Sequence, residues 1–75
     1  MSNNEEIKRF GEKLRYLRQR EGLSQEQLGN MLDVHQTHVG RIERGAKMPN
    51  AAMILKISRL FRVSADVLIK DELDL

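Results

Sequence analysis

The segment from Leu23 to Gly45, LSQEQLGNMLDVHQTHVGRIERG, constrains the fold of this chain more than any other stretch. Ser24 precedes a run of periodic apolar residues and Gln27 follows three positions later, which is the pattern of a helix start with a capping box. That run ends at Asp33, a residue type common in turns. A second short helix is expected from about Gln36 to Arg44, where the terminal glycine stops it. The segment therefore predicts two short capped helices joined by a tight turn.

Similar start and stop signals recur along the rest of the chain, and no stretch has the pattern of a useful β-strand. The chain of 75 residues is long enough for one small domain and has no cysteine to supplement its core. We therefore predict an all-α fold of five helices in a single domain, residues 1–75, with residues 1–4 and 71–75 frayed. Besides the two central helices, the expected elements are a helix from about Glu5 to Glu21 capped by Asn3 or Asn4, a helix from Ala51 to Phe61 announced by Pro49 and Asn50, and a short helix from Ser64 to about Lys70.

Composition limits the cellular compartment and the kinds of partner that are expected for this chain. The absence of cysteine suits a reducing cytoplasm, and no apolar run approaches the length of a membrane span. The N-terminal residues lack the basic-then-apolar order of a signal peptide. A net charge of +2 with 32% charged residues is a weak excess for a nucleic-acid binder, so the position of each charge matters more than the total. We expect a cytoplasmic protein that neither spans nor binds a membrane.

The central residues resemble the Cro/repressor-type helix-turn-helix domain of the XRE family. Nearly the whole chain takes part, and its size is similar to that of small stand-alone regulators such as restriction-modification controller proteins and single-domain phage repressors. The resemblance implies a lambda-repressor-like domain of five helices. It also implies a two-fold dimer whose recognition helix enters the major groove of a pseudo-palindromic operator. The matching residues are Leu23-Ser24-Gln25-Glu26-Gln27-Leu28, Val34, Val39, Arg41-Ile42-Glu43-Arg44-Gly45 and Pro49-Asn50.

Three residues of the second central helix are candidates for contacts with DNA bases. Gln36 opens the helix, and its amide can pair with adenine N7 and N6 in the major groove. Thr37 can offer a methyl group to thymine or a hydroxyl to a base, or it can cap the helix locally in place of His35. Arg41 lies farther along the same face, where it can bind guanine O6 and N7, contact a phosphate, or remain a solvated charge.

Four more residues are candidates for contacts with the DNA backbone. Gln25 stands in the first turn of its helix, where free amides and the helix dipole favour a phosphate, although it can equally be an ordinary helix residue. His38 can contact a phosphate or a base edge, or be an exposed polar residue. The family places cations and amides at the positions of Arg44 and Lys47, whose alternative is a solvated loop charge. His35 and His38 alone are too few ligands for a metal site, and His35 is expected to be a helix cap.

The resemblance also implies a structural ion pair. The family pairs the acid at the position of Glu43 with an arginine of the first helix, and Arg18 stands at the matching position. We expect this pair to be largely buried and to set the angle between the first helix and the recognition helix. The other cations of the first helix are interpreted as a mostly solvated face, and Tyr16 can reach a phosphate or pack; those cations are Lys8, Arg9, Lys13, Arg15 and Arg20.

The helix from Ala51 to Phe61 is apolar around more of its circumference than packing on one side requires. Met53, Leu60 and Val67 are larger or more apolar than the family pattern, and a second copy of the chain is the simplest cover for them. We therefore expect an isologous dimer interface on the last two helices, which would place two recognition helices about 34 Å apart. The alternative is a fully internal helix, because a small domain needs much of its apolar surface for its own core.

Three positions depart from the family pattern. Asp33 replaces the usual left-handed glycine of the turn, and aspartate tolerates that conformation better than most residues. Arg62 stands where glycine commonly ends the fourth helix, so that helix ends differently or bears strain. Gly29 replaces the usual alanine, so it keeps the close approach to the second central helix but should weaken its own helix by about 1 kcal/mol.

These observations favour a sequence-specific transcriptional regulator that binds double-stranded DNA as a homodimer. The alternative is a protein-interaction module of the same fold, an antitoxin or an adaptor, for which DNA binding is secondary. An enzyme is not expected, because the chain lacks cysteine, an acid pair with a supporting base and a glycine-rich phosphate loop. We predict no cofactor, no metal site and no small-molecule ligand domain.

Overall fold

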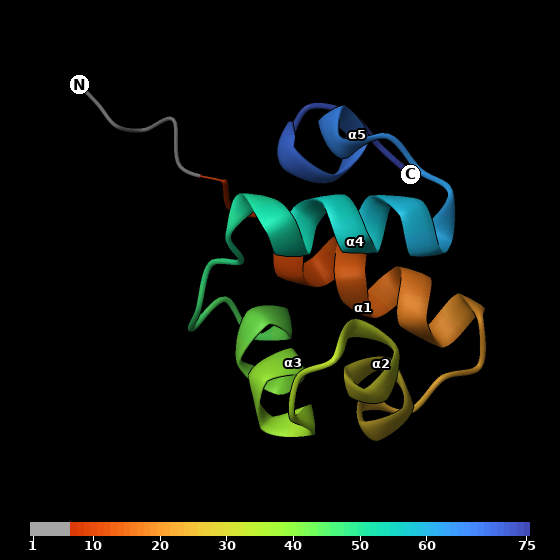
Figure 1. The fold of residues 1–75 in the computed structure, drawn as a ribbon. Helices are drawn as coiled ribbons and strands as arrows, with labels where there is room; N and C mark the ends of the chain where they lie inside the picture. The colour runs from red at the N-terminus through yellow and green to blue at the C-terminus, as the bar shows by residue number, and fades with distance from the viewer. Residues whose placement is uncertain (1–6) are drawn as a thin grey trace.

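The computed structural model describes residues 7–75, and the order of its elements confirms the prediction of an all-α fold. In Figure 1, α5 lies at one end of the molecule, α2 and α3 lie at the other, and α4 and α1 lie between them. The described residues form five helices: α1 (Phe10–Arg20), α2 (Gln25–Leu32), α3 (Gln36–Glu43), α4 (Ala51–Phe61) and α5 (Ala65–Ile69).

A single apolar core connects all five helices. In α1, Phe10, Leu14 and Leu17 are buried, and Ile7 packs on the core from the segment before the helix. The loop before α4 contributes buried Pro49. The remaining large core residues are Leu28, Leu32, Val39, Ile42, Met53, Ile54, Ile57, Phe61 and Leu68.

The start of α1 differs from the prediction. The helix begins at Phe10, not near Glu5, and Arg9 stands at its N-cap without a side-chain cap. In a helix beginning near Glu5, the amide of Arg9 would donate to a carbonyl four residues earlier. It donates instead to Asp71 Oδ1 at 3.0 Å, and the Lys8 amide donates to Asp71 Oδ2 at 2.9 Å. The Asp71 carboxylate therefore accepts hydrogen bonds from the amides that precede α1. Asn3 and Asn4, the predicted caps, lie outside the described residues.

The residues after α5, for which fraying was predicted, make contacts with α1, and Lys13 is buried. Lys13 is 1% exposed, and its Nζ donates to the carbonyls of Val67, Lys70 and Leu73 at 2.7, 2.8 and 2.7 Å. The last carbonyls of a helix lack partners within that helix, so a buried ammonium with three donors can satisfy them. Lys13 therefore fastens the end of α5 and the residues after it to α1.

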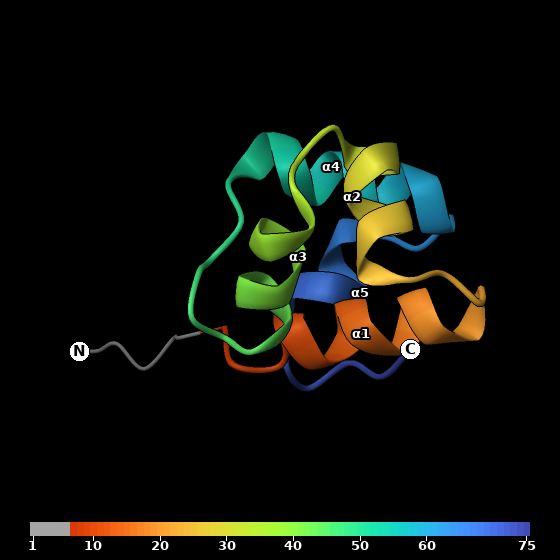
Figure 2. The same cartoon turned by 90° about the horizontal axis from the view of Figure 1, so that it is seen from below.

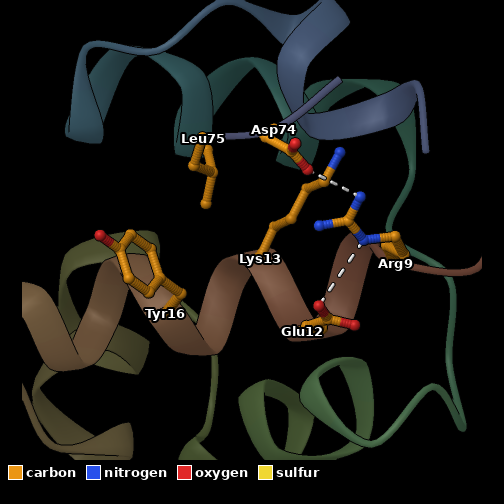
Figure 3. A pocket seen from close by; sticks show the side chains of 6 residues that line it. All are labelled: Arg9, Glu12, Lys13, Tyr16, Asp74 and Leu75. Atoms are coloured by element: carbon orange, nitrogen blue, oxygen red, sulfur yellow. Dashed lines mark hydrogen bonds and ion pairs between the residues drawn. The ribbon is translucent and has the colours of Figure 1, made fainter. Parts of the chain in front are cut away.

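Arg9 adds a second attachment at the surface. Its Nη1 donates to the Asp71 carbonyl at 2.7 Å and to Asp74 Oδ1 at 3.1 Å, and its Nε lies 3.6 Å from Glu12 Oε2. Figure 3 shows the resulting hollow, in which Leu75 points toward α1 beside Tyr16. Tyr16, for which a phosphate contact was one interpretation, is 53% exposed on this side of α1.

The Asp71 contact predicts an acid dependence of stability. The amides of Lys8 and Arg9 hold the pKa of the Asp71 carboxyl below its ordinary value of 3.8. Because the carboxylate is favoured in the folded state, its contribution is present above the ordinary pKa and is lost as the pH falls through the lowered one. We expect Asp71→Asn to lower the melting temperature at neutral pH, and the difference from wild type to close as the pH falls below about 4. If the difference in melting temperature between the two proteins stays constant down to the lowest pH at which both fold, this role of Asp71 is contradicted. Asp66→Asn serves as the control, because its ion pair with Lys70 is exposed and 3.8 Å long.

The ends of α2 and α4 agree with the sequence. The Ser24 hydroxyl accepts from the Gln27 amide at 3.0 Å and Gln27 Oε1 accepts from the Ser24 amide at 2.8 Å, which confirms the capping box. The bounds of α4 are those predicted, with Asn50 Oδ1 accepting from the Met53 amide. Asp33 and Arg62 follow α2 and α4 in the left-handed conformation, with φ of 64° and 58°.

The backbone of Arg62 predicts a stabilising substitution. A side chain with a Cβ is strained at φ 58°, and glycine adopts this conformation freely. We expect Arg62→Gly to raise the free energy of unfolding by about 1 kcal/mol, after the entropic cost of glycine is subtracted. Urea denaturation measures this value. Gly22→Ala is the opposite change at a matched position, because Gly22 has φ 71° and open space around its Cβ position. We expect the free energy of unfolding of Gly22→Ala to fall by a similar amount. An unchanged Arg62→Gly midpoint would contradict the argument.

Candidate nucleic-acid interface

The turn between α2 and α3 depends on a close approach at Gly29. A Cβ at this position would lie 2.6 Å from the Val34 carbonyl oxygen and 3.2 Å from the Gln36 amide nitrogen. The Val34 amide donates to the Gly29 carbonyl at 2.8 Å, so the chain folds back directly over the end of α2. The close approach expected at Gly29 is present, because α3 begins against this surface and leaves no room for alanine's methyl group.

The first turn of α3 carries the candidate base-contacting side chains into solvent. His35 caps the helix as expected, with Nδ1 accepting from the Thr37 amide at 3.0 Å. Gln36, Thr37 and Arg41 are all exposed. Thr37 and Arg41 are four residues apart and therefore share one face of the helix. This face belongs to the end of the molecule formed by α2 and α3, opposite α5 (Figure 1).

The Arg18–Glu43 ion pair expected from the resemblance is present and nearly buried. Arg18 Nε donates to Glu43 Oε2 at 2.6 Å and Nη2 donates to Oε1 at 3.1 Å, and the two side chains are 12% and 4% exposed. Arg18 Nη1 also donates to the Leu23 carbonyl at 2.9 Å. A bidentate pair of this kind fixes the relative orientation of the planar groups. The pair therefore connects α1, the loop before α2, and the end of α3.

Gln25 joins the same network. Its Nε2 donates to Glu43 Oε1 at 3.1 Å, which adds α2 to the elements held by this carboxylate. A Cβ on Gly40 would be tight against Arg44 Nη1 at 3.1 Å and in ordinary contact with Gln25 Oε1 at 3.4 Å. Two candidate backbone-contacting residues, Gln25 and Arg44, are thus brought together over the glycine of α3. Local sequence patterns do not predict the Gln25–Glu43 bond, because its partners belong to different helices.

The other candidates for backbone contacts lie at the two ends of α3's exposed surface. His38 is half-buried, one turn beyond the cap, and Lys47 is exposed in the loop that follows the helix. The Lys47 amide donates to the Arg41 carbonyl at 3.3 Å, which holds the start of this loop against the end of α3. Arg44 and Lys47 therefore extend the polar surface past the C-terminal end of α3.

Gly11 is a structural residue of this region that sequence reasoning missed. A Cβ at Gly11 would overlap the Ile42 carbonyl oxygen and lie 2.6 Å from the Glu43 carbonyl oxygen. The glycine thus lets the backbone of α1 touch the end of α3, which lies beside α1 in Figure 2. The available signal was a lone glycine inside a predicted helix, which often marks a close approach.

The structure corrects one of the three residues expected at a dimer interface. Met53 is 9% exposed and packs within the core of the chain itself, so it is not spare surface for a partner. Leu60 and Val67 are half-buried. Leu60 lines a groove with the apolar Leu23, Met31 and Phe61, and the exposed Leu55 lies elsewhere on α4.

Within residues 7–75, no group of three or more His, Cys, Asp or Glu side chains is placed to hold a metal ion. None of the helices in that range is both long and apolar enough to cross a membrane.

The helix-turn-helix family model matches residues 14–68. The chain therefore belongs to this helix-turn-helix family, and the predicted resemblance is confirmed. Its relatives include the HTH-type transcriptional activator BcrR of Enterococcus faecalis, 40% identical over 63 residues that make up 84% of this chain and 31% of BcrR. The uncharacterized HTH-type transcriptional regulator YazB of Bacillus subtilis is 33% identical over 84% of this chain and 91% of its own length. The chain thus spans about a third of the first relative and most of the second.

Solved structures give the same assignment. The P22 c2 repressor in complex with a synthetic operator matches with a TM-score of 0.77 and 31% identity, over 81% of this chain and 92% of that one. The restriction-modification controller protein C.AhdI from Aeromonas hydrophila matches with a TM-score of 0.73 and 34% identity, over 83% and 94%. One of these structures is a repressor on an operator and the other is a controller protein, which agrees with the helix-turn-helix family of this chain.

Proposed function

We propose that this chain is a cytoplasmic transcriptional regulator that binds a pseudo-palindromic operator as a homodimer, with α3 in the major groove. The observation that supports this most strongly is the exposed polar face of α3, carried by a helix pair that a nearly buried ion pair holds in place. The P22 c2 repressor, which has a similar structure, is in complex with a synthetic operator, and this favours DNA as the partner of this chain.

The proposed base contacts are those of Gln36, Thr37 and Arg41. An amide, a hydroxyl and a guanidinium on the first two turns of α3 can together distinguish adenine, thymine and guanine edges in the major groove. These side chains are exposed, and within residues 7–75 only Thr37 among them has a recorded side-chain hydrogen bond, to His35.

The proposed backbone contacts surround those base contacts. The first-turn amides of α2 at Gln25 and the cations of Arg44 and Lys47 can bind phosphates on either side of the groove, with His38 between them. Gln25 would then have two tasks, because its side-chain nitrogen already donates to Glu43. Such contacts set the register of the protein on the duplex.

The proposed dimer uses the surface of α4 and α5 around Leu60 and Val67, without Met53. Both residues leave part of their surface uncovered, and the nearby groove contains exposed Met31. A two-fold axis through this region would place two copies of α3 about 34 Å apart, one turn of DNA.

Selection of bound sites from random DNA tests the base contacts. Wild type should yield half-sites with two-fold symmetry, and Gln36→Ala and Arg41→Ala should each abolish the preference at one position, because a good bidentate pair discriminates by about 1–3 kcal/mol. A uniform loss of affinity without change in preference would make these residues phosphate contacts. Lys47→Ala is the control, since a phosphate contact should weaken all sites alike and reduce the dependence on salt.

Sedimentation tests the dimer separately. Wild type should sediment as a dimer at tens of micromolar or when operator is added, and Leu60→Lys and Val67→Lys should be monomers. Leu55→Lys is the control on the same helix and should remain dimeric. A monomer in every condition would exclude the dimer, and disruption by Leu55→Lys alone would move the interface to another face of α4.

A further inference from the structure

An imidazole caps the recognition helix, at a position where hydroxyl, amide and carboxylate side chains are preferred. His35 Nδ1 lies 3.0 Å from the Thr37 amide nitrogen and also 3.0 Å from Thr37 Oγ1. The amide can only donate, so Nδ1 must carry its lone pair and the ring proton must be on Nε2. The contact of the helix cap therefore fixes the tautomer of His35.

The same tautomer fixes the direction of the Thr37 hydroxyl. Because Nδ1 of His35 presents a lone pair, the Thr37 hydroxyl can only donate its hydrogen to it. The lone pairs of Thr37 Oγ1 then remain available to accept from another partner. An imidazolium reverses this arrangement, because its Nδ1–H cannot accept from the Thr37 amide but can donate to Oγ1. The hydroxyl hydrogen is then free to point outward, and the helix loses its cap.

We propose that His35 is a positioning residue that sets whether Thr37 offers DNA a hydrogen-bond acceptor or a donor, and so makes the base preference of α3 depend on pH. With neutral His35, the Thr37 oxygen can accept from adenine N6 or cytosine N4. With charged His35, the Thr37 hydroxyl can donate to guanine O6 or N7 or to thymine O4. The inference rests on the proposed contact between Thr37 and bases.

The charged and titratable groups around this end of α3 come from three elements. Asp33 lies in the turn after α2, His38 lies one turn along α3, and Lys56 of α4 donates to the Leu32 carbonyl at 3.1 Å. Across residues 7–75, the recorded hydrogen bonds and ion pairs link none of these three side chains to the imidazole. Histidine is the side-chain type whose charge ordinarily changes between about pH 5 and 8, so the two histidines are the groups to separate.

The first measurement needs no DNA. The amide proton of Thr37 is followed by NMR between about pH 8 and 5.5, a range that spans the usual titration of histidine. In wild type it should lose its hydrogen-bonded chemical shift together with the titration of the His35 ring, whereas in His35→Asn, whose side-chain oxygen can still cap the helix, it should not. A wild-type Thr37 amide that ignores the His35 titration would overturn the proposal.

The second measurement repeats site selection at about pH 7.5 and 5.5, on either side of the usual histidine titration. Wild type should change its preference by roughly fivefold or more at the base pair whose preference Thr37→Ala abolishes, and His35→Asn should not change. His38→Gln should bind all sites more weakly and keep the change. If Gln36→Ala and Thr37→Ala alter the selected sites but wild type selects the same bases at both pH values, this inference fails while the proposed function stands. If wild type selects no sequence at either pH, both fail.

Discussion

Replacing Gly11 with alanine is expected to lower the free energy of unfolding by more than about 3 kcal/mol, the upper end of the usual cost of overpacking. A Cβ at Gly11 would lie 2.6 Å from the Glu43 carbonyl oxygen and 2.9 Å from the carbonyl carbon. Both atoms belong to the backbone at the end of α3, so they cannot rotate away as a side chain would. The methyl group can be accommodated only if α1 and α3 separate, and that separation would open the core at Phe10 and Ile42.

Gly40→Ala is the matched control for this prediction. Both glycines are buried in helices, but a Cβ at Gly40 would meet only the ends of the Gln25 and Arg44 side chains. Those ends can move, and alanine favours the helix, so the change in stability should stay within about 1 kcal/mol. Urea denaturation followed by circular dichroism measures both variants. A Gly11→Ala protein as stable as Gly40→Ala would show that α1 and α3 do not touch in this way, whereas a chain that fails to fold would agree with the prediction.

Replacing Glu43 with alanine should cost about 3–5 kcal/mol, because it leaves the guanidinium of Arg18 without its partner in a nearly buried site. Arg18 Nε and Nη2 both donate to this carboxylate, and Gln25 Nε2 donates to it as well. Three donors would then lack an acceptor where water has little access. The melting temperature should fall accordingly, and an unchanged value would contradict the role of the pair.

Two further variants separate the buried pair from charge in general. Glu21→Ala removes an acid whose contact with Arg20 is 3.5 Å and exposed, so its effect should stay below about 1 kcal/mol. The double variant Arg18→Met with Glu43→Met removes both buried charges together. It should recover much of the stability lost by Glu43→Ala, because the cost lies mainly in the unpaired charge. If the double variant is less stable than Glu43→Ala, the ion pair itself stabilises the fold, and the cost of Glu43→Ala is not mainly that of an unpaired charge.

The boundaries of α2 and α4 show what could be predicted from local sequence. Ser24 with Gln27 and Asn50 before Met53 form caps between residues three apart, and such contacts depend little on the rest of the fold. The left-handed backbone of Asp33 was expected from the family pattern, in which a left-handed glycine usually stands in this turn. The Arg18–Glu43 pair was expected from the family resemblance, since its partners are 25 residues apart.

The incorrect predictions concern places where residues from distant parts of the chain are in contact. Lys13 looked like one cation among several on a polar face, and only the fold brings the carbonyls after α5 to its ammonium. The start of α1 was misplaced because its amides are served by Asp71, 62 residues beyond Arg9. Met53 looked like surplus apolar surface because the sequence does not show how much of α4 its own core covers.

The sequence by itself determined the class of this protein: five helices, the capped pair from Leu23 to Gly45, and a polar first turn on the second helix of that pair. These features follow from hydrophobic period and from contacts within a few residues, which are encoded locally. The tertiary structure alone decided how α3 is held, through Gly11, Gln25 and Glu43, and how the C-terminal residues close over α1. These features depend on which backbone groups approach each other after the helices pack. The effect of a buried charge or of a missing Cβ is determined by those neighbours, which local sequence does not specify.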